Sequence, residues 1–201
     1  MFGINTATYD NLIVFLGNPG DKYENTRHNA GFIIGDYIAT KLGVTIEKEK
    51  FLSKTVATTI NGQKCLLIKP QTFMNLSGDA ILAASNYYKI PIEKVIVVQD
   101  EVALNVGIFR IKIGGSCAGH NGIRDILEKV EDKFIRIRVG VGEKPSKEYD
   151  IINWVLGKFP KEDREKIDDI SPDILNAIEL IVCGNISKAM SLYNKTNTKK
   201  V

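Results

Sequence analysis

Histidine and cysteine are scarce in this chain of 201 residues, which contains two histidines and three cysteines. The cysteines are odd in number, stand far apart and form no C-x-x-C pair, so the sequence indicates neither a disulfide framework nor a zinc site. The two histidines are also distant in sequence, which disfavours a cluster of histidine and cysteine ligands. We therefore expect no bound metal.

Long apolar runs are missing as well. No stretch reaches the roughly 18 residues that a membrane span needs. The N-terminus, "MFGINTATYD", has neither the basic segment nor the apolar core of a secretory signal. The glycine-containing stretches "GNPG" and "VGVG" match neither G-x-G-x-x-G nor a Walker loop, which disfavours a nucleotide cofactor. We expect a cytoplasmic protein without membrane contact or cofactor, and the net charge of +3 permits an anionic partner such as RNA without requiring one.

Apolar patterning alternates between strand and helix along one domain. The expected strands are 12–16, 51–60, 64–69, 94–98, 107–113 and 134–141, and the expected helices are 26–42, 79–89, 121–130, 161–170 and 172–193. Asn61-Gly62 predicts a hairpin turn because both residues tolerate positive φ, and Pro172 suits the first turn of the last helix. The pattern predicts a single α/β domain, a mixed twisted β-sheet sandwiched between helices in three layers. We place this domain at 11–195, between an N-terminal extension at 1–10 and a C-terminal tail at 196–201.

Residues that stand out from the apolar pattern as site candidates follow four of the expected strands. Sites in such sheets gather at the carboxyl ends of the strands. We therefore expect these loops to converge at one edge of the sheet. The residues concerned are Asn18, Met74, Asn75, Asp100, His120 and Asn121.

His28 is the leading candidate for proton transfer, because an imidazole with a pKa of roughly 6.5 accepts a proton near neutral pH. Asp100 is suited to orient and polarise it. The alternatives are an exposed histidine at a helix start and an aspartate that caps a turn. Side-chain amides suit an oxyanion or a peptide backbone, although asparagine is also common in ordinary turns; the four in these loops are Asn18, Asn29, Asn75 and Asn121.

Other polar residues leave several readings open. His120 suits a second base, a phosphate contact or loop packing. Cys117 invites a nucleophile reading, but "GGSCAG" fails the G-x-S-x-G pattern because Ala118 replaces the last glycine. Basic side chains on the later strands and loop suit either a phosphate clamp or a solvated surface; these are Lys112, Arg124 and Arg138.

Four motifs in order make a specific combination: "LGNPGDKYENTRHNAGF", "KPQTFMNLSG", "QDEVAL" and "GHNGIRDI". From about Asn11 to Tyr193, the chain closely resembles the bacterial-type peptidyl-tRNA hydrolases. The resemblance implies hydrolysis of the ester bond between peptide and tRNA, which releases tRNA from peptidyl-tRNA that has left the ribosome early. It also implies a single α/β domain that acts as a monomer on peptidyl-tRNA, meeting the acceptor stem, the 3′ end and the nascent peptide.

The resemblance also implies roles for particular residues. His28 matches the catalytic base that activates water, and Asp100 matches its partner. Lys112 and Arg138 match residues that clamp the tRNA 5′ phosphate. Residues matching the substrate-binding positions of the family are Asn18, Tyr23, Asn29, Met74, Asn75, His120 and Asn121.

The sequence departs from the family pattern at three places. Phe15 stands where the first motif usually has glycine, and Glu143 stands near a position that is more often basic. Ser116-Cys117-Ala118 replaces a loop richer in glycine and histidine. Two other functions are therefore kept in view: an RNA-binding module of the same fold without the reaction, and a hydrolase that uses Cys117.

Overall fold

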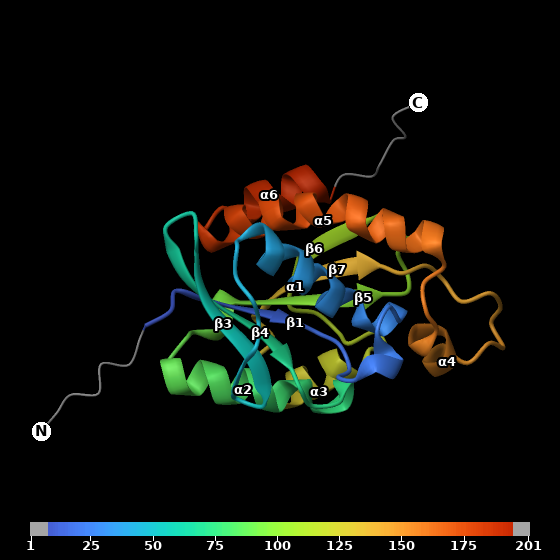
Figure 1. The fold of residues 1–201 in the computed structure, drawn as a ribbon, viewed down its shortest axis with the longest axis horizontal. Coiled ribbons are helices and arrows are strands. Elements are labelled where there is room, and N and C mark those ends of the chain that lie inside the picture. The colour runs from blue at the N-terminus through green and yellow to red at the C-terminus, as the bar shows by residue number, and fades with distance from the viewer. Residues whose placement is uncertain (1–7, 195–201) are drawn as a thin grey trace, which may run out of the picture.

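A mixed sheet of seven strands forms the centre of the molecule, in the order β2-β3-β4-β1-β5-β7-β6. The computed structural model describes residues 8–194 (Figure 1). The predicted fold class, a mixed sheet between helices, is confirmed. The strands are β1 (Asn11–Phe15), β2 (Lys48–Lys50), β3 (Ser53–Ile60), β4 (Gln63–Pro70), β5 (Val95–Glu101), β6 (Phe109–Ile113) and β7 (Ile135–Gly140). The helices are α1 (Ala30–Lys41), α2 (Ser77–Tyr88), α3 (Asn121–Lys129), α4 (Ile151–Leu156), α5 (Lys161–Val182) and α6 (Ile186–Tyr193).

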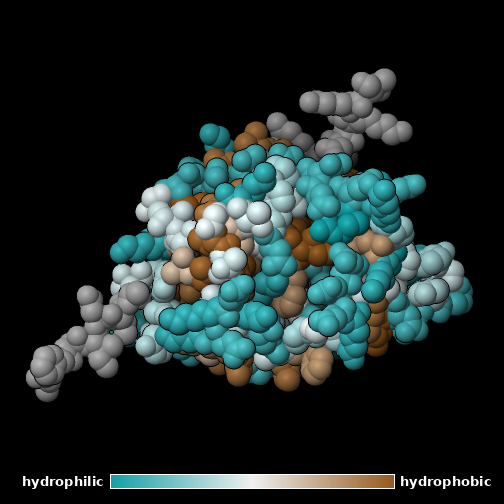
Figure 2. All heavy atoms as spheres, in the orientation of Figure 1, coloured by the Kyte–Doolittle hydropathy of each residue, from teal (hydrophilic) through white to brown (hydrophobic). Residues whose placement is uncertain are grey.

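Helices cover both faces of the sheet and bury a separate apolar cluster on each. Figure 1 shows α5 and α6 on one side, α2 and α3 on the other, and α1 in front of the strands. Ile13 and Val98 belong to the cluster beneath α1, α5 and α6, whereas Val14 and Val97 belong to the cluster beneath α2 and α3. Every residue of β1 and β5 is buried, as expected for strands covered on both faces. On the face shown in Figure 2, most residues are hydrophilic, with apolar side chains visible between them.

Strand direction decides which loops meet. β1 runs parallel to β4 and β5, and β5 runs parallel to β7, so the carboxyl ends of these strands share one edge of the sheet. β6 runs antiparallel to β7, and its end at Ile113 therefore lies at the opposite edge. The expectation that strand 107–113 delivers His120 by its carboxyl end is wrong in direction. The segment 114–119 instead returns across the sheet to reach the site.

The buried side chain of Arg136 holds this return segment. Its Nη1 donates to the carbonyl oxygens of Gly114, Gly115 and Ser116 at 3.3, 3.0 and 2.9 Å. Its Nε donates to Gln99 Oε1 at 3.0 Å. Because Gln99 lies in β5, the arginine ties the segment to the strand that carries Asp100.

The predicted hairpin is confirmed, and one strand is longer than predicted. Asn61 and Gly62 join β3 to β4 with φ values of 47° and 79°. β5 continues beyond position 98 because Asp100 pairs with Val139 of β7. Asp100 therefore lies inside a strand at the carboxyl edge, where the sheet holds its backbone.

The C-terminal helices differ from the prediction at Pro172. A single helix, α5, continues through this proline, although proline lacks the N–H that would bond to the carbonyl four residues earlier. Ile167 and Ile174 are fully buried on either side of it, so packing holds the helix together across the missing bond. The chain instead breaks at Gly184, whose φ of 82° favours glycine.

Two short elements, β2 and α4, were not predicted. They have 3 and 6 residues, too few for a hydrophobic period to be visible. The expected helix 26–42 begins instead with a short 3-10 helix, Arg27–Asn29, followed by α1. Thr26 makes no side-chain cap there; its hydroxyl donates to the Tyr23 carbonyl at 2.8 Å.

The predicted extension at 1–10 is attached to the sheet where it is described. Asp10 N–H donates to Lys64 O at 2.7 Å, and the rings of Tyr9 and Tyr88 pack edge to face. The predicted tail at 196–201 lies outside the described residues. Within 8–194, no helix has the length and apolarity needed to cross a membrane.

Candidate active site

Three polar side chains from distant parts of the chain meet at the carboxyl edge of the sheet. Asp100 comes from β5, His28 from the 3-10 helix before α1, and His120 from the residue that precedes α3. α1 packs on one face of the sheet and α3 on the other. The two histidines therefore approach Asp100 from opposite faces.

Asp100 accepts hydrogen bonds from both imidazoles. His28 Nδ1 lies 2.9 and 3.0 Å from the two carboxylate oxygens, and His120 Nε2 lies 2.9 Å from Oδ1. The two imidazole rings are 5.0 Å apart between centroids. His28 and Asp100 are 8% and 2% exposed, so this hydrogen-bonded pair is almost completely shielded from water.

The hydrogen bonds determine which nitrogen of each ring carries a proton. His120 Nδ1 accepts from the Ile123 backbone N–H at 3.3 Å, so the proton of the neutral ring is on Nε2, facing Asp100. Both nitrogens of His120 are therefore engaged. His28 places its Nδ1–H against Asp100, which leaves the lone pair on Nε2 free to accept a proton.

Electrostatics favour the charged carboxylate and a basic imidazole. Burial alone would raise the pKa of Asp100, but the neighbouring His28 and His120 hold it well below its usual value. Burial likewise opposes protonation of His28, but the charge and hydrogen bond of Asp100 outweigh it and raise the pKa of His28 above its usual value. The pair thus has the arrangement of a base and its orienting carboxylate.

The same three side chains are the described residues grouped closely enough to hold a metal ion, with ligand atoms within 4.8 Å of one another. The two nitrogens that face Asp100 serve as N–H donors to it. A metal would have to replace these protons, because a ligating imidazole nitrogen needs its lone pair. The hydrogen-bonded triad fits proton transfer better than metal ligation.

Asn29, next to His28 in the chain, clamps the backbone of Asn18 in the loop after β1, and both residues line a cavity of about 360 Å³. Asn29 Oδ1 accepts from the Asn18 backbone N–H at 2.8 Å, and Asn29 Nδ2 donates to the Asn18 carbonyl at 2.9 Å. Asn18 Oδ1 accepts from the Met74 backbone N–H at 2.8 Å. The orientation of the Asn18 amide is thereby determined, and its Nδ2 makes no hydrogen bond within residues 8–194. Asn29 was predicted to bind substrate. In this structure its side chain binds the backbone of Asn18 and so supports the loop.

Met74 and Asn75 occupy different environments in the turn before α2. Met74 is buried, and its sulfur lies against Gly122 so closely that a Cβ there would meet Sδ at 2.6 Å. Asn75 is exposed. Tyr23 is half-buried and packs its ring edge-on against Phe73, with centroids 6.5 Å apart. Tyr23 and Asn75 thus lie in the loops that follow β1 and β4.

A cavity of about 100 Å³ opens beside the triad. Its polar lining residues include His28, Asp100 and Asn121, and α4 supplies an apolar wall. The remaining lining residues are Glu101, Val102, Cys117, Ala118, Gly119, His120, Ile151, Ile152 and Val155. Polar groups that converge in a partly apolar cavity are typical of a substrate site.

Cys117 lines this cavity but is not paired with a base. The backbone N–H of Gly119 and the side chain of Arg124 lower the pKa of its thiol. Within the described residues, neither histidine is hydrogen-bonded to its sulfur. The Cys/His arrangement that a thiol nucleophile requires is not assembled here.

The predicted phosphate-binding residues lie on β6 and β7. Arg138 forms an ion pair with Glu101, its Nη2 and Nε lying 2.7 and 2.8 Å from Oε2. Lys112 is exposed and stands opposite Arg136 in the β6–β7 pairing. Arg110 and Arg138 form the neighbouring pair, so these four basic residues share one face of the sheet edge.

Sequence reasoning missed several residues that shape the site. It did not detect the second hydrogen bond to Asp100 from His120, the Glu101 partner of Arg138, or the buried Arg136. It also missed α4 and the stacking of Arg27 on Trp154. Two signals for the contact between Arg27 and Trp154 were available in the sequence: Arg27 is next to His28, and the chain has a single tryptophan.

Comparisons with known proteins agree with this geometry. The sequence profile described as Peptidyl-tRNA hydrolase matches residues 12–201. A peptidyl-tRNA hydrolase of Clostridium perfringens is 44% identical over 187 residues, covering 92% of this chain and 98% of that protein. One of Clostridium acetobutylicum is 44% identical over 184 residues, covering 91% and 97%.

Solved structures show the same fold. The crystal structure of peptidyl-tRNA hydrolase from Acinetobacter baumannii has a TM-score of 0.87 and 37% identity, covering 94% of this chain and 97% of that one. A complex of peptidyl-tRNA hydrolase with N-propanol has a TM-score of 0.88 and 36% identity, covering 96% and 100%. Sequence profile, relatives and fold together show that this chain belongs to the peptidyl-tRNA hydrolase family.

Proposed function

We propose that this protein hydrolyses the ester bond between peptide and tRNA in peptidyl-tRNA, using water activated by His28. The observation that carries the mechanism is the His28–Asp100 hydrogen bond of 2.9 Å, which leaves His28 Nε2 free at the cavity. Family membership supports the substrate, since the matched relatives are named peptidyl-tRNA hydrolases.

In the proposed reaction, His28 Nε2 takes a proton from water while the water oxygen attacks the ester carbonyl. Asp100 stabilises the imidazolium that forms, because its buried carboxylate faces the Nδ1–H. The tetrahedral intermediate then collapses, the bond to the 3′ oxygen of tRNA breaks, and the imidazolium returns its proton to that oxygen. The products are a peptide with a free carboxyl group and tRNA with a free 3′ hydroxyl.

A side-chain amide is proposed to stabilise the oxygen that becomes negative in the intermediate. Asn18 is the best-oriented donor, because Met74 N–H engages its Oδ1 and leaves Nδ2 to donate. Asn121 lines the cavity and Asn75 is exposed in the turn before α2, so both are assigned to binding the peptide or the 3′ end. We assign Asn29, Met74 and His120 to supporting roles, in which they fix the positions of neighbouring site residues.

The tRNA is proposed to bind across the adjoining surface. Tyr23, half-buried beside Phe73, offers a ring for stacking of a 3′-terminal base. Lys112 and Arg138 are assigned to a phosphate of the acceptor stem. Glu101 already neutralises part of the Arg138 charge, so Lys112 is expected to contribute more to phosphate attraction. We also propose that the protein acts as a monomer in the cytoplasm, because ribosomes produce peptidyl-tRNA there.

The test is release of labelled peptide from N-acylated aminoacyl-tRNA by wild type, His28→Ala and His120→Ala. We expect His28→Ala to lose about 10²–10⁴-fold in kcat, the usual contribution of a general base, while tRNA binding is retained. His120→Ala is the matched comparison and should lose less, because its nitrogens are engaged by Asp100 and Ile123. Wild type that binds tRNA but releases no peptide would identify a binding module. Turnover in His28→Ala equal to wild type would remove the mechanism.

A further inference from the structure

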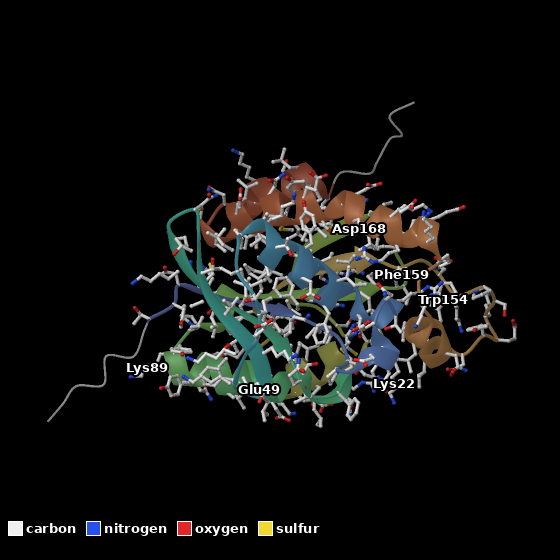
Figure 3. All side chains as sticks on the ribbon, viewed as in Figure 1. Lys22, Glu49, Lys89, Trp154, Phe159 and Asp168 are labelled. Atoms are coloured by element: carbon white, nitrogen blue, oxygen red, sulfur yellow. The ribbon has the colours of Figure 1, made fainter. Side chains whose placement is uncertain are left out.

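Arg27, the residue before His28, is buried against an aromatic side chain of α4. It is 6% exposed, and its guanidinium carbon lies 3.6 Å from the centroid of the Trp154 ring. The centroid of the Phe159 ring lies 5.8 Å from the same carbon. Figure 3 labels Trp154 and Phe159, which lie at the end of the molecule occupied by α4. A planar cation stacked on an indole ring is a strong form of cation–π contact when water is excluded.

Hydrogen bonds attach α4 and the residues after it, 154–159, to the short 3-10 helix that carries His28 and to the residues just before it. Arg27 Nη1 donates to the carbonyls of Trp154 and Lys158 at 3.4 and 3.2 Å. The Arg27 backbone N–H donates to Gly157 O at 3.0 Å, and Phe159 N–H donates to Asn25 O at 2.8 Å. α4 has six residues, too few to be stable alone. Its position therefore depends on contacts with other segments, namely these and the hydrogen bond that Trp154 Nε1 donates to Gly142 O at 2.9 Å.

α4 in turn forms the apolar wall of the cavity. Ile151, Ile152 and Val155 line it together with His28 and Asp100. Arg27 itself is not among the lining residues. Any effect of Arg27 on substrate must therefore pass through another element.

From this arrangement, we propose that Arg27 is a positioning residue that holds α4 as the wall against which the acyl part of the substrate packs. The inference rests on the proposed function, since it concerns binding of the substrate at the same cavity. His28 and Asp100 keep their own hydrogen bonds when Arg27 is changed, so the base is expected to keep its pKa. Loss of Arg27 should weaken binding more than it slows the chemical step.

Two substitutions separate charge from stacking. Arg27→Lys keeps the charge but loses the planar group and the donors that reach two carbonyls. Arg27→Met keeps the length and loses the charge as well. For both variants we expect KM for N-acylated aminoacyl-tRNA to rise about tenfold, the size of one partly lost apolar contact, with kcat within about threefold of wild type. The pH at which kcat/KM is half-maximal should not move.

Trp154 gives a readout that needs no substrate, because it is the single tryptophan of the chain. Both variants should shift its emission to longer wavelength and increase its quenching by acrylamide, as the ring becomes more exposed. Lys41→Met is the matched control, since this exposed lysine at the end of α1 also lies over an aromatic ring, 5.5 Å from the Tyr37 centroid, and has no contact with α4 among the described residues. It should leave KM and emission unchanged.

A double-mutant cycle tests the coupling directly. Trp154→Leu removes the ring from the other side of the stack, so its effect on KM should not add to that of Arg27→Met. Additive effects, a shifted pH profile, or variants with wild-type KM and emission would each overturn the inference. Wild type that releases no peptide would instead overturn the proposed function, while the emission changes would still report whether Arg27 holds α4.

Discussion

Replacement of Asp100 by asparagine is the sharpest test of the site, because it keeps the size of the side chain and removes its charge. The carboxylate accepts from His28 and His120 at 2.9 Å each. An amide has one oxygen to accept with, and its NH₂ group then faces an imidazole nitrogen. The packing is preserved, so the change acts on hydrogen bonding and charge. To satisfy the amide, His28 must turn its protonated nitrogen toward the cavity, where it no longer accepts a proton.

The expected loss in kcat for Asp100→Asn is about 10²–10⁴-fold, the usual contribution of a general base. This corresponds to about 3–5 kcal/mol of transition-state stabilisation. The magnitude agrees with the loss of one or two hydrogen bonds to a charged group, each worth about 1.5–3 kcal/mol. Removing a buried charge also removes its desolvation cost, so we expect the fold to remain stable.

The pH profile supplies a second measurement with a definite sign. In wild type, Asp100 raises the pKa of His28, and the rate rises with pH through that raised value because the base must be neutral. In Asp100→Asn only burial remains, and burial lowers the pKa of His28. The residual activity should therefore have its acid limb at lower pH than wild type.

Initial rates of peptide release between about pH 5 and 9, with circular dichroism to verify folding, provide the assay. Asp36→Asn is the matched control, since Asp36 pairs with Lys69 at the surface, and it should stay within about twofold of wild type. A folded Asp100→Asn protein with less than tenfold loss in kcat, or with an unmoved acid limb, would refute the reasoning.

Three further predictions concern other parts of the molecule. Cys117→Ala should keep turnover within about threefold of wild type, because no base among the described residues is hydrogen-bonded to the thiol. A loss of about 10³-fold in release of labelled peptide would instead indicate that Cys117 is the nucleophile. Lys112→Ala should weaken tRNA binding and reduce its salt dependence more than Arg138→Ala, which removes a charge already paired with Glu101; equal salt slopes in filter binding would contradict this. Pro172→Ala should raise the unfolding free energy by about 1 kcal/mol or more by restoring a helix N–H; an unchanged urea midpoint would argue against a cost at Pro172.

The layers of the fold were predictable because they follow from local patterns. The run 12–16 is apolar at every position, and β1 is buried throughout. Asn61-Gly62 accepts positive φ, and the hairpin forms there. Prediction failed at Pro172, where the local preference for a helix start lost to the burial of Ile167 and Ile174.

Three of the predicted site residues, His28, Asp100 and His120, meet at one edge of the sheet, but not all by the expected route. Asn18 and Asp100 follow or occupy parallel strands, so their meeting at one edge was deducible from the order of strands and helices. His120 arrives there although β6 points the other way. The segment that leads to it turns at Gly114 and Gly115, which have positive φ, and is held by the buried Arg136 through three of its carbonyls.

By itself, the sequence determined the buried strands, the candidate base and carboxylate, and the family, because these depend on residue type and order along the chain. The tertiary structure alone decided that Asp100 serves two histidines, that Asn29 supports Asn18, and that Arg27 holds α4. Each of these depends on contacts between residues distant in sequence, and their distances and directions are set only when the sheet has paired and its two faces are covered.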